Sequence, residues 1–350
     1  MIASSSTRGT AIPTYNLSLL GFGNVNRTLA QLLAQREAEL RALEIEWRIT
    51  GIASRRLGWI ADPGGLAPYL RADGHVNLDA VPKVARTSAN VRDWLAAARA
   101  DVLFEATSLS LEDGQPAIDH MRAALAHGAH AITANKGPIV HAYRELRDLA
   151  SRRARRFLFE STVMDGVPIF SLFRENLPVV RLEGFRGILN STTNMILGEM
   201  EAGVTFDAAV KKAQDMGLAE TDATHDIEGW DASVKVVALV TVLMDEQIRL
   251  RDVEREGISN LTAEQVRAAR AEGRPYKLVC SARRTGSGVK ARVAPEQVPL
   301  SDPLALVTRT SSIVYFETDI FPGICITENN PGLVTTAYGM LADFIRAVSR

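Results

Sequence analysis

The chain has 350 residues, 46% of them hydrophobic, and its 40 lysines and arginines against 41 aspartates and glutamates leave a net charge of −1. This balance gives no electrostatic case for nucleic acid or an anionic membrane as a partner. The longest strongly apolar run, residues 236–244, is about half of what a membrane-spanning helix needs. Length and composition indicate a globular enzyme with two domains, or with one domain and a large insertion.

The N-terminal residues and the cysteines indicate the compartment. Residues 1–14 are rich in serine and threonine and lack the apolar segment of a signal peptide. Cys280 and Cys325 form neither a C-x-x-C pair nor a disulfide framework, which favours a reducing compartment. We therefore expect a cytoplasmic protein.

A glycine-rich turn opens the first half of the chain. Residues 16–20 are predicted to form a buried strand, and residues 24–33 carry apolar side chains at helical spacing. The turn and the helix start consist of Gly21, Phe22, Gly23, Asn24 and Val25. A strand, a Gly-x-Gly turn and a helix begin a Rossmann unit, in which the backbone closely approaches a pyrophosphate at the helix N-terminus. Asn26 replaces the third glycine of the motif, so a plain strand–helix turn is an equal alternative.

Basic residues end the second predicted strand, residues 47–53. Ser54, Arg55 and Arg56 follow it, where an NAD-selective site carries an acid for the ribose 2′-hydroxyl. Arginines at this place suit a 2′-phosphate instead, so we expect NADP as the preferred cofactor, with NAD as the other option. The alternative is two solvated arginines at a strand end.

Two further predicted strands, residues 101–105 and 131–133, are followed by polar side chains. A helix predicted over residues 116–127 separates them, and this alternation predicts a parallel sheet. Ligands bind at the carboxyl ends of strands in such sheets. The polar residues at these ends are Thr107, Ser108, Asn135 and Lys136.

One dense basic run, residues 152–156, ends a helical segment just before a strand at residues 157–159. Basic side chains suit the negative end of a helix dipole. The balanced net charge argues against a nucleic-acid role. We therefore interpret the run as a solvated helix end.

Polar residues gather again after a strand predicted at residues 181–189. Asn190 and Thr192 belong to five consecutive polar residues that precede a helix predicted at residues 195–202. N-capping explains one such residue, but five exceed what a cap requires.

The stretch 217–235 combines acids with one lysine and runs into the apolar helix at residues 236–244. Asp231 and Lys235 are four residues apart, so they project from the same face of a helix. An acid beside a lysine suits a site that orients a substrate and transfers a proton. The alternative is an exposed ion pair, which is common at this spacing.

These motifs together resemble the homoserine dehydrogenase family over most of the chain. The matching stretches are residues 21–25, 133–138, 160–168, 187–194 and 217–235. The resemblance implies an α/β fold with an N-terminal Rossmann dinucleotide-binding domain, residues 1–140, and an α+β catalytic and dimerisation domain, residues 141–330. It also implies that the C-terminal helix, about residues 331–350, packs back on the first domain, that no C-terminal regulatory domain follows, and that the protein is a homodimer.

The resemblance implies a role for each matching residue. Lys235 is implied as the proton-transfer residue and Lys136 as the lysine between nicotinamide and substrate. The implied substrate-binding residues are Glu220, Asp226, Asp231, Asn190 and Thr192. A monovalent cation such as sodium, held largely by backbone carbonyl groups, is implied at the loop with Glu160, Val163 and Asp165.

The implied activity is the NAD(P)-dependent interconversion of L-homoserine and L-aspartate 4-semialdehyde, a step of threonine and methionine biosynthesis. Alcohol oxidation needs a base, and a lysine serves when a neighbouring cation lowers its pKa; we expect Lys136 to do so for Lys235. The chain departs from the family at Met164–Asp165, at Ser191 and at residues 329–331. A dehydrogenase of this fold acting on another small hydroxy acid or amino alcohol is therefore the second hypothesis, and a non-catalytic dinucleotide sensor or a scaffold protein the third.

Overall fold

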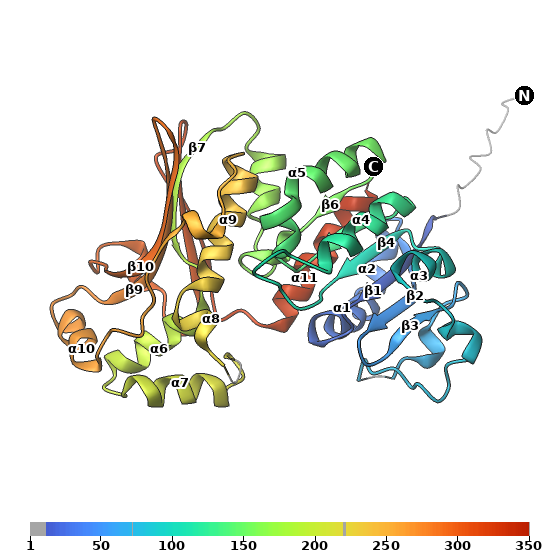
Figure 1. Cartoon of the computed structure of the whole chain (residues 1–350), viewed down its shortest axis with the longest axis horizontal. Coiled ribbons are helices and arrows are strands. Elements are labelled where there is room, and N and C mark those ends of the chain that lie inside the picture. The colour runs from blue at the N-terminus through green and yellow to red at the C-terminus, as the bar shows by residue number, and fades with distance from the viewer. Residues whose placement is uncertain (1–11, 72, 220–221, 350) are drawn as a thin grey trace, which may run out of the picture.

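Two six-stranded sheets, each covered by helices, make up the molecule (Figure 1). The computed structural model describes residues 12–71, 73–219 and 222–349. The first sheet and its helices lie at one end of the molecule and the second sheet lies at the other (Figure 1). The prediction of an α/β fold with a Rossmann-type first half is confirmed.

The first sheet is parallel except at one edge. From edge to edge its strands are β3 (Gly58–Ala61), β2 (Glu46–Ser54), β1 (Thr14–Leu20), β4 (Val102–Glu105), β5 (His130–Thr133) and β6 (Phe157–Leu158). Strands β2, β1, β4, β5 and β6 run parallel, as the alternation of strands and helices predicts. Strand β3 turns back on β2 as an antiparallel hairpin, which the sequence pattern did not indicate.

Helices cover both faces of this sheet. They are α1 (Asn24–Gln35), α2 (Glu37–Ala42), α3 (Val91–Ala98), α4 (Ala117–His127), α5 (Gly137–Arg152) and α11 (Leu333–Val348). Helix α11, at the C-terminal end of the chain, packs beside α1 in one buried cluster. Its Phe344 ring lies 5.9 Å from the ring of Tyr15 and 6.0 Å from that of Phe104. Helix α11 is thereby packed against strands β1 and β4 of the first sheet.

The second sheet is antiparallel apart from one short strand. Its strand order is β12 (Ile324–Glu328), β11 (Ser312–Thr318), β7 (Leu182–Ile188), β9 (Tyr276–Thr285), β10 (Gly288–Gln297) and β8 (Glu254–Arg255). Only the β10–β8 pair is parallel among the described pairings. The helices of this half are α6 (Ser191–Glu201), α7 (Phe206–Asp215), α8 (Thr224–Ile227), α9 (Trp230–Leu243) and α10 (Ala263–Ala271).

Helix α9 joins the two halves. It packs against α5 of the first half and against β9 and β10 of the second, and its residues 232–234 and 236–241 are buried. A helix that is apolar all round is stable only when other elements surround it. The apolar run alone would start this helix at residue 236, but α9 begins at Trp230, so Asp231 and Lys235 are both helical, as their spacing predicts.

Across the described ranges, none of the helices combines the length and the apolar character needed to cross a membrane.

Candidate active site

The glycine turn after β1 is built for close backbone approach. Gly21 adopts a φ of +77°, and a Cβ atom there would lie 2.5 Å from the backbone of Ala106. The amides of Gly21 and Phe22 donate to the carbonyl oxygen of Ala53 at 2.9 and 3.1 Å. Gly23 then caps the N-terminus of α1. The turn therefore places free helix-terminal N–H groups at the carboxyl end of the sheet, where a pyrophosphate binds in this fold.

Asn26 explains why the third glycine is dispensable. Its side-chain amide is fully buried and donates to the carbonyl oxygens of Leu20 at 2.9 Å and Gly21 at 3.2 Å. These bonds attach the first turn of α1 to the end of β1. A glycine would permit the same close packing but would leave these two carbonyl groups without the side-chain donor.

The polar residues after β4 and β5 are held together by one amide. Asn135 donates to the carbonyl oxygens of Thr107 at 3.1 Å and Ser108 at 3.2 Å. Its own side-chain oxygen accepts the N–H of Gly137 at 2.9 Å, which fixes the start of α5. The two strand ends therefore form one rim, as the sequence predicts.

Arg55 and Arg56 lie in the turn between β2 and β3, next to the glycine turn. Ser54 closes that turn by accepting the N–H of Leu57 at 3.1 Å. Both arginines are exposed, and among the described residues neither side chain has a hydrogen-bond or ion-pair partner. Asn24, at the start of α1, accepts a hydrogen bond from the Arg27 guanidinium at 2.5 Å through its side-chain oxygen. The arginines are therefore available at the place where a ribose 2′-substituent lies in Rossmann sites.

Asp231 lies between the two lysines that are predicted site residues, Lys136 and Lys235. Its Oδ1 lies 3.2 Å from Lys136 Nζ, and its Oδ2 lies 3.1 Å from Lys235 Nζ. The Lys235 ammonium also donates to the carbonyl oxygen of Leu189 at 2.6 Å. The three side chains are only 15–22% exposed. They are therefore an ion-paired cluster inside the protein, and not a solvated surface pair.

The charges in this cluster set its protonation. Burial disfavours the charged form of Asp231, but Lys235 and Lys136 outweigh it and hold the pKa of Asp231 well below its usual range. Burial alone would lower the pKa of Lys235, but Asp231 and then Asp165 outweigh it and raise that pKa. The expectation that Lys136 lowers the pKa of Lys235 is therefore wrong, because the carboxylate between the two ammonium groups dominates.

Asn190 and Asp226 extend the cluster toward the start of α6. The Asn190 amide donates to Asp226 at 2.7 Å and to Asp231 at 3.1 Å. Burial, together with the charge of Asp231, raises the pKa of Asp226. Thr192 donates to the carbonyl oxygen of Leu218 at 3.1 Å. These four predicted residues therefore meet, while Glu220 lies outside the described residues.

A cleft of about 240 Å³ connects the strand rim to the lysine cluster. It is lined by Val25, Ala106, Thr107, Ala134, Lys136, Ser161, Thr162, Val163, Asp165, Lys235 and Thr336. The first sheet, the loop at residues 161–165, helix α9 and helix α11 all contribute to it. The start of α1, the strand rim and the two lysines therefore open onto one space.

Some cleft residues were not singled out from the sequence. Thr336 comes from α11, and its hydroxyl donates to the Asp165 carboxylate. Ser161 and Thr162 lie in a stretch that matches the family, which was their only signal. Nothing in the local sequence marks Thr336, because only the packing of α11 brings it to the cleft.

The departures from the family pattern lie around this cleft. Met164 is buried in the core, and Asp165 takes a left-handed φ of +43° with its carboxylate facing the cleft. Ser191 is the first residue of α6. Asn330, also left-handed at +47°, donates its N–H to Ser311 Oγ at 3.2 Å just before α11.

The expected cation loop has a carboxylate that is already engaged. Glu160 is 2% exposed, and its two oxygens accept the N–H groups of Phe170 at 2.7 Å and Ser171 at 2.9 Å. The Arg346 guanidinium lies 3.4 Å from Glu160 and 3.2 Å from Asp343. A protein cation therefore already faces this buried pair of acids.

Known proteins match this arrangement over nearly the whole chain. The family model described as "Homoserine dehydrogenase, NAD binding domain" matches residues 21–160, and the one described as "Homoserine dehydrogenase" matches residues 168–345. An NAD(+)-dependent homoserine dehydrogenase from Pseudomonas canavaninivorans is 35% identical over 339 residues, which are 95% of each chain.

Two solved structures also resemble this chain over nearly its whole length. A homoserine dehydrogenase from Thiobacillus denitrificans has a TM-score of 0.80 at 30% identity, covering 96% of this chain and 73% of that one. A hyperthermophilic archaeal homoserine dehydrogenase mutant in complex with NADPH has a TM-score of 0.79 at 26% identity, covering 96% and 98%. These matches do not favour a dehydrogenase for another hydroxy compound. The chain belongs to the homoserine dehydrogenase family, the NAD(P)-dependent oxidoreductases that interconvert L-homoserine and L-aspartate 4-semialdehyde by acting on a CH–OH group.

Proposed function

We propose that Lys235 is the proton donor and acceptor of this reaction and that Lys136 orients the reacting oxygen beside it. The Lys136–Asp231–Lys235 contacts at the cleft carry this proposal. A bound nicotinamide supplies the hydride acceptor or donor, and the open glycine turn and strand rim fit its pyrophosphate and ribose. Lys235 then takes the hydroxyl proton during oxidation and returns it to the alkoxide during reduction.

The raised pKa of Lys235 makes the two directions depend differently on pH. Reduction of the aldehyde needs the ammonium form, which is already present at neutral pH. Oxidation needs the neutral amine, whose fraction grows as pH rises toward the lysine pKa. We therefore expect the initial rate of oxidation to rise steadily from pH 7 to pH 10, and the initial rate of reduction to stay level or fall. Rates with saturating substrates in both directions test this, and an oxidation profile that is flat over this range would contradict it.

We propose that Asp226, Asp231, Asn190, Thr192 and Glu220 bind the substrate's polar end. Carboxylates suit the ammonium group of an amino acid, and four of the five residues meet around Asn190.

Changing Glu220 to glutamine tests the ammonium contact. We expect KM for homoserine to rise about tenfold or more while kcat changes little, because an ammonium contact is shared by ground and transition states. A matched control is Glu264→Gln on the exposed side of α10, which should alter neither constant. An unchanged KM in the Glu220 variant would show that this carboxylate does not bind the amino group.

We further propose that NADP binds more tightly than NAD. Arg55 and Arg56 support this preference, because both are exposed beside the glycine turn and have no side-chain partner among the residues that the structure describes. Among relatives, one similar protein is NAD(+)-dependent and one similar structure holds NADPH, so the choice depends on this chain's own residues.

The cofactor preference should be about tenfold or more, since a charge-assisted contact contributes roughly 1.5–3 kcal/mol. The double variant Arg55→Ala/Arg56→Ala should lose that preference, and the preference of the unchanged chain should shrink at high salt. Dissociation constants for both nucleotides measure it. The control, Arg152→Ala/Arg153→Ala, removes two exposed arginines elsewhere, and an equal loss of preference there would argue against the proposal.

The side-chain carboxylates at the implied cation loop already have partners. Both Glu160 oxygens accept backbone N–H groups, and Arg346 supplies positive charge next to them. The Asp165 carboxylate accepts the Thr336 hydroxyl and faces the cleft. We therefore propose no role for sodium in the proton or hydride steps.

We also propose the domain division that the resemblance implies, with residues 1–140 binding the nucleotide, residues 141–330 forming the catalytic and dimerisation domain, and the C-terminal helix returning to the first. The packing of α11 on α1 supports the last point. A homodimer and a cytoplasmic location remain predictions from the sequence.

A further inference from the structure

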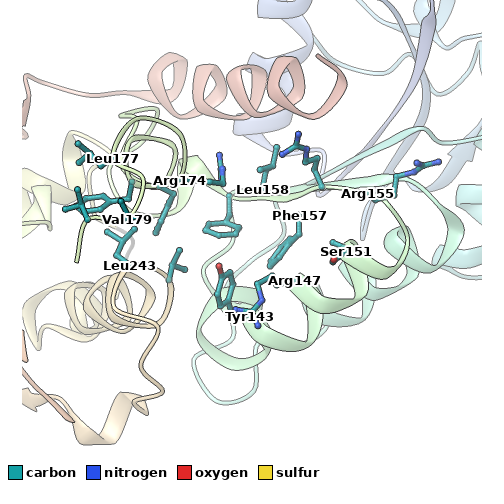
Figure 2. A pocket seen from close by; sticks show the side chains of 17 residues that line it. Tyr143, Arg147, Ser151, Arg155, Phe157, Leu158, Arg174, Leu177, Val179 and Leu243 are labelled. Carbon is teal, nitrogen blue, oxygen red and sulfur yellow. The ribbon is translucent and has the colours of Figure 1, made fainter. Parts of the chain in front are cut away.

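A second cavity, of about 480 Å³, is lined by residues on either side of the loop that lines the cleft. Figure 2 shows its walls: Tyr143 and Arg147 from α5, Phe157 from β6, and Arg174 and Leu243 from the opposite side. We call it the arginine cavity. Two of its lining residues, Arg155 and Arg156, belong to the basic run that the sequence analysis interpreted as a solvated helix end.

The inner wall of the arginine cavity is aromatic. Phe157, Phe159 and Phe170 are buried, and their neighbouring ring centres lie 5.1 and 4.9 Å apart. The Tyr143 ring stands edge-on to Phe159 at 5.7 Å. This wall suits the apolar or aromatic body of a ligand.

The charge of the lining is entirely positive. Its charged members are Arg147, Arg155, Arg156 and Arg174, and the described lining includes no aspartate or glutamate. Arg147 pairs with Asp148 and, at 3.9 Å, with Asp245, and Arg174 pairs with Glu175; all three acids are exposed and lie outside the lining. The Arg156 guanidinium has no partner among the residues that the structure describes. Such a lining favours an anion over an ammonium group.

The pKa of a neighbouring histidine, His130, is consistent with the positive charge of the lining. Burial, and then the charges of Arg155 and Arg156, lower the pKa of His130 to about 4. Its Nδ1 accepts the backbone N–H of Arg156 at 3.0 Å. Positive charge is therefore already concentrated at this end of the cavity.

The arginine cavity and the cleft share one segment of chain. Residues 157–159 line the cavity, four of residues 161–165 line the cleft, and Phe170, Phe173 and Arg174 line the cavity again. Glu160 fixes the segment, because it accepts the N–H of Phe170, a cavity residue. Helix α9 carries Asp231 at one end and Leu243 at the other, about 18 Å apart at the rise of an α-helix. The cavity is thus separate from the active site but mechanically connected to it.

We propose that the arginine cavity binds a small organic anion, a carboxylate or monophosphate with an apolar or aromatic body and no ammonium group, and that its occupation changes turnover at the cleft. The guanidiniums bind the anionic head, and the aromatic wall contacts the body. A ligand in the cavity contacts residues before and after the cleft-lining part of the segment, residues 161–165. Its binding therefore shifts the preferred position of Asp165 and its neighbours. This site is additional to the dehydrogenase activity.

Calorimetric titration of the full chain tests the binding. The protein is first saturated with NADP⁺, so that aryl anions cannot enter the nucleotide site. The probes are benzoate and phenyl phosphate, with benzyl alcohol as the neutral control and phenylalanine as the zwitterionic one. We expect saturable binding of at least one anion, tenfold or more tighter than either control. The tighter of the two anions identifies the head group. Absence of saturable anion binding, or equal binding of all four compounds, overturns the proposal.

Variants locate the site. Arg156→Gln/Arg174→Gln should weaken anion binding at least tenfold. Ser151→Glu, which adds a carboxylate to the exposed part of the wall, should do the same without removing a packing contact. Arg152→Gln/Arg153→Gln changes two arginines of the same run outside the lining and should leave binding intact. Unchanged binding in both cavity variants, or an equal loss in the control, places the anion elsewhere.

Kinetics test the coupling. Saturating anion should change kcat/KM for homoserine at least twofold in the unchanged chain and not in the cavity variants. A bound anion without kinetic effect overturns the regulatory part. Because calorimetry needs no turnover, failure of this proposal is distinguishable from failure of the proposed catalytic roles.

Discussion

Replacing Lys235 by alanine is expected to lower kcat for homoserine oxidation by a factor on the order of 10² to 10⁴, the usual contribution of a positioned acid–base group. The ammonium group lies at the cleft with Leu189 and Asp231 as its partners, at 2.6 and 3.1 Å. No other lysine takes its place, because Lys136 approaches Asp231 from the other carboxylate oxygen. Steady-state rates in both directions measure the loss.

The control for this variant is Lys211→Ala. Lys211 forms an exposed ion pair with Asp215 at the same spacing of four residues on α7, so its removal should leave kcat unchanged. NADP binding should be nearly the same in both variants, because the proposed role of Lys235 is to exchange a proton with the substrate and not to bind the nucleotide. Near-normal turnover in Lys235→Ala would exclude this lysine from proton transfer.

The parts of the site that the sequence could predict are those encoded over short distances. The Asp231–Lys235 contact follows from helix geometry alone, since residues four apart share a face. The glycine turn follows from the strand, glycine and helix pattern, and the position of Asn135 from its place just after a strand. In each case the local sequence determines which way the side chain points.

Contacts between segments far apart in the sequence could not be predicted from the residue pattern. The Lys136–Asp231 pair forms because α5 packs on α9, and Thr336 reaches the cleft only because α11 returns to the first sheet. The pairing of Arg346 with Glu160 has the same origin. The resemblance to a family supplied some of these neighbours, but not the carboxylate's effect on the lysine pKa. That effect depends on which charge lies closest, and only the assembled structure shows it.

The start of α9 shows a second limit of pattern reasoning. Polar and acidic residues before an apolar run suggest a loop, because a solvated stretch without periodicity has no apolar face to bury. Here the stretch is helical from Trp230 because packing extends the helix, with Ala232 and Val234 buried and the Arg255 guanidinium 3.7 Å above the Trp230 ring. The burial of these side chains in the folded protein therefore outweighed the local preference of the polar residues for a loop.

Replacing Asp231 by asparagine is expected to lower kcat/KM for homoserine oxidation on the order of 10²-fold at pH 7–8. The substitution keeps the shape of the side chain but removes the negative charge between Lys136 and Lys235. Lys136 and Lys235 then lose the carboxylate that lies between them, so their mutual repulsion displaces both ammonium groups from the reacting oxygen. Some stability is also lost, less than the ~3–5 kcal/mol of a fully buried broken pair, because the Asp231 side chain is 22% exposed.

The pH profile separates a charge role from a merely structural role for Asp231. Its carboxylate is the main cause that raises the pKa of Lys235, so without it the amine loses its proton at lower pH. The rise of the oxidation rate with pH should therefore move toward acid in Asp231→Asn, partly restoring activity near pH 9. Asp215→Asn, which breaks the exposed pair on α7, should shift neither the rate nor the profile. A loss of activity in Asp231→Asn with an unshifted profile would mean that Asp231 supports the fold of the site and does not control the proton on Lys235.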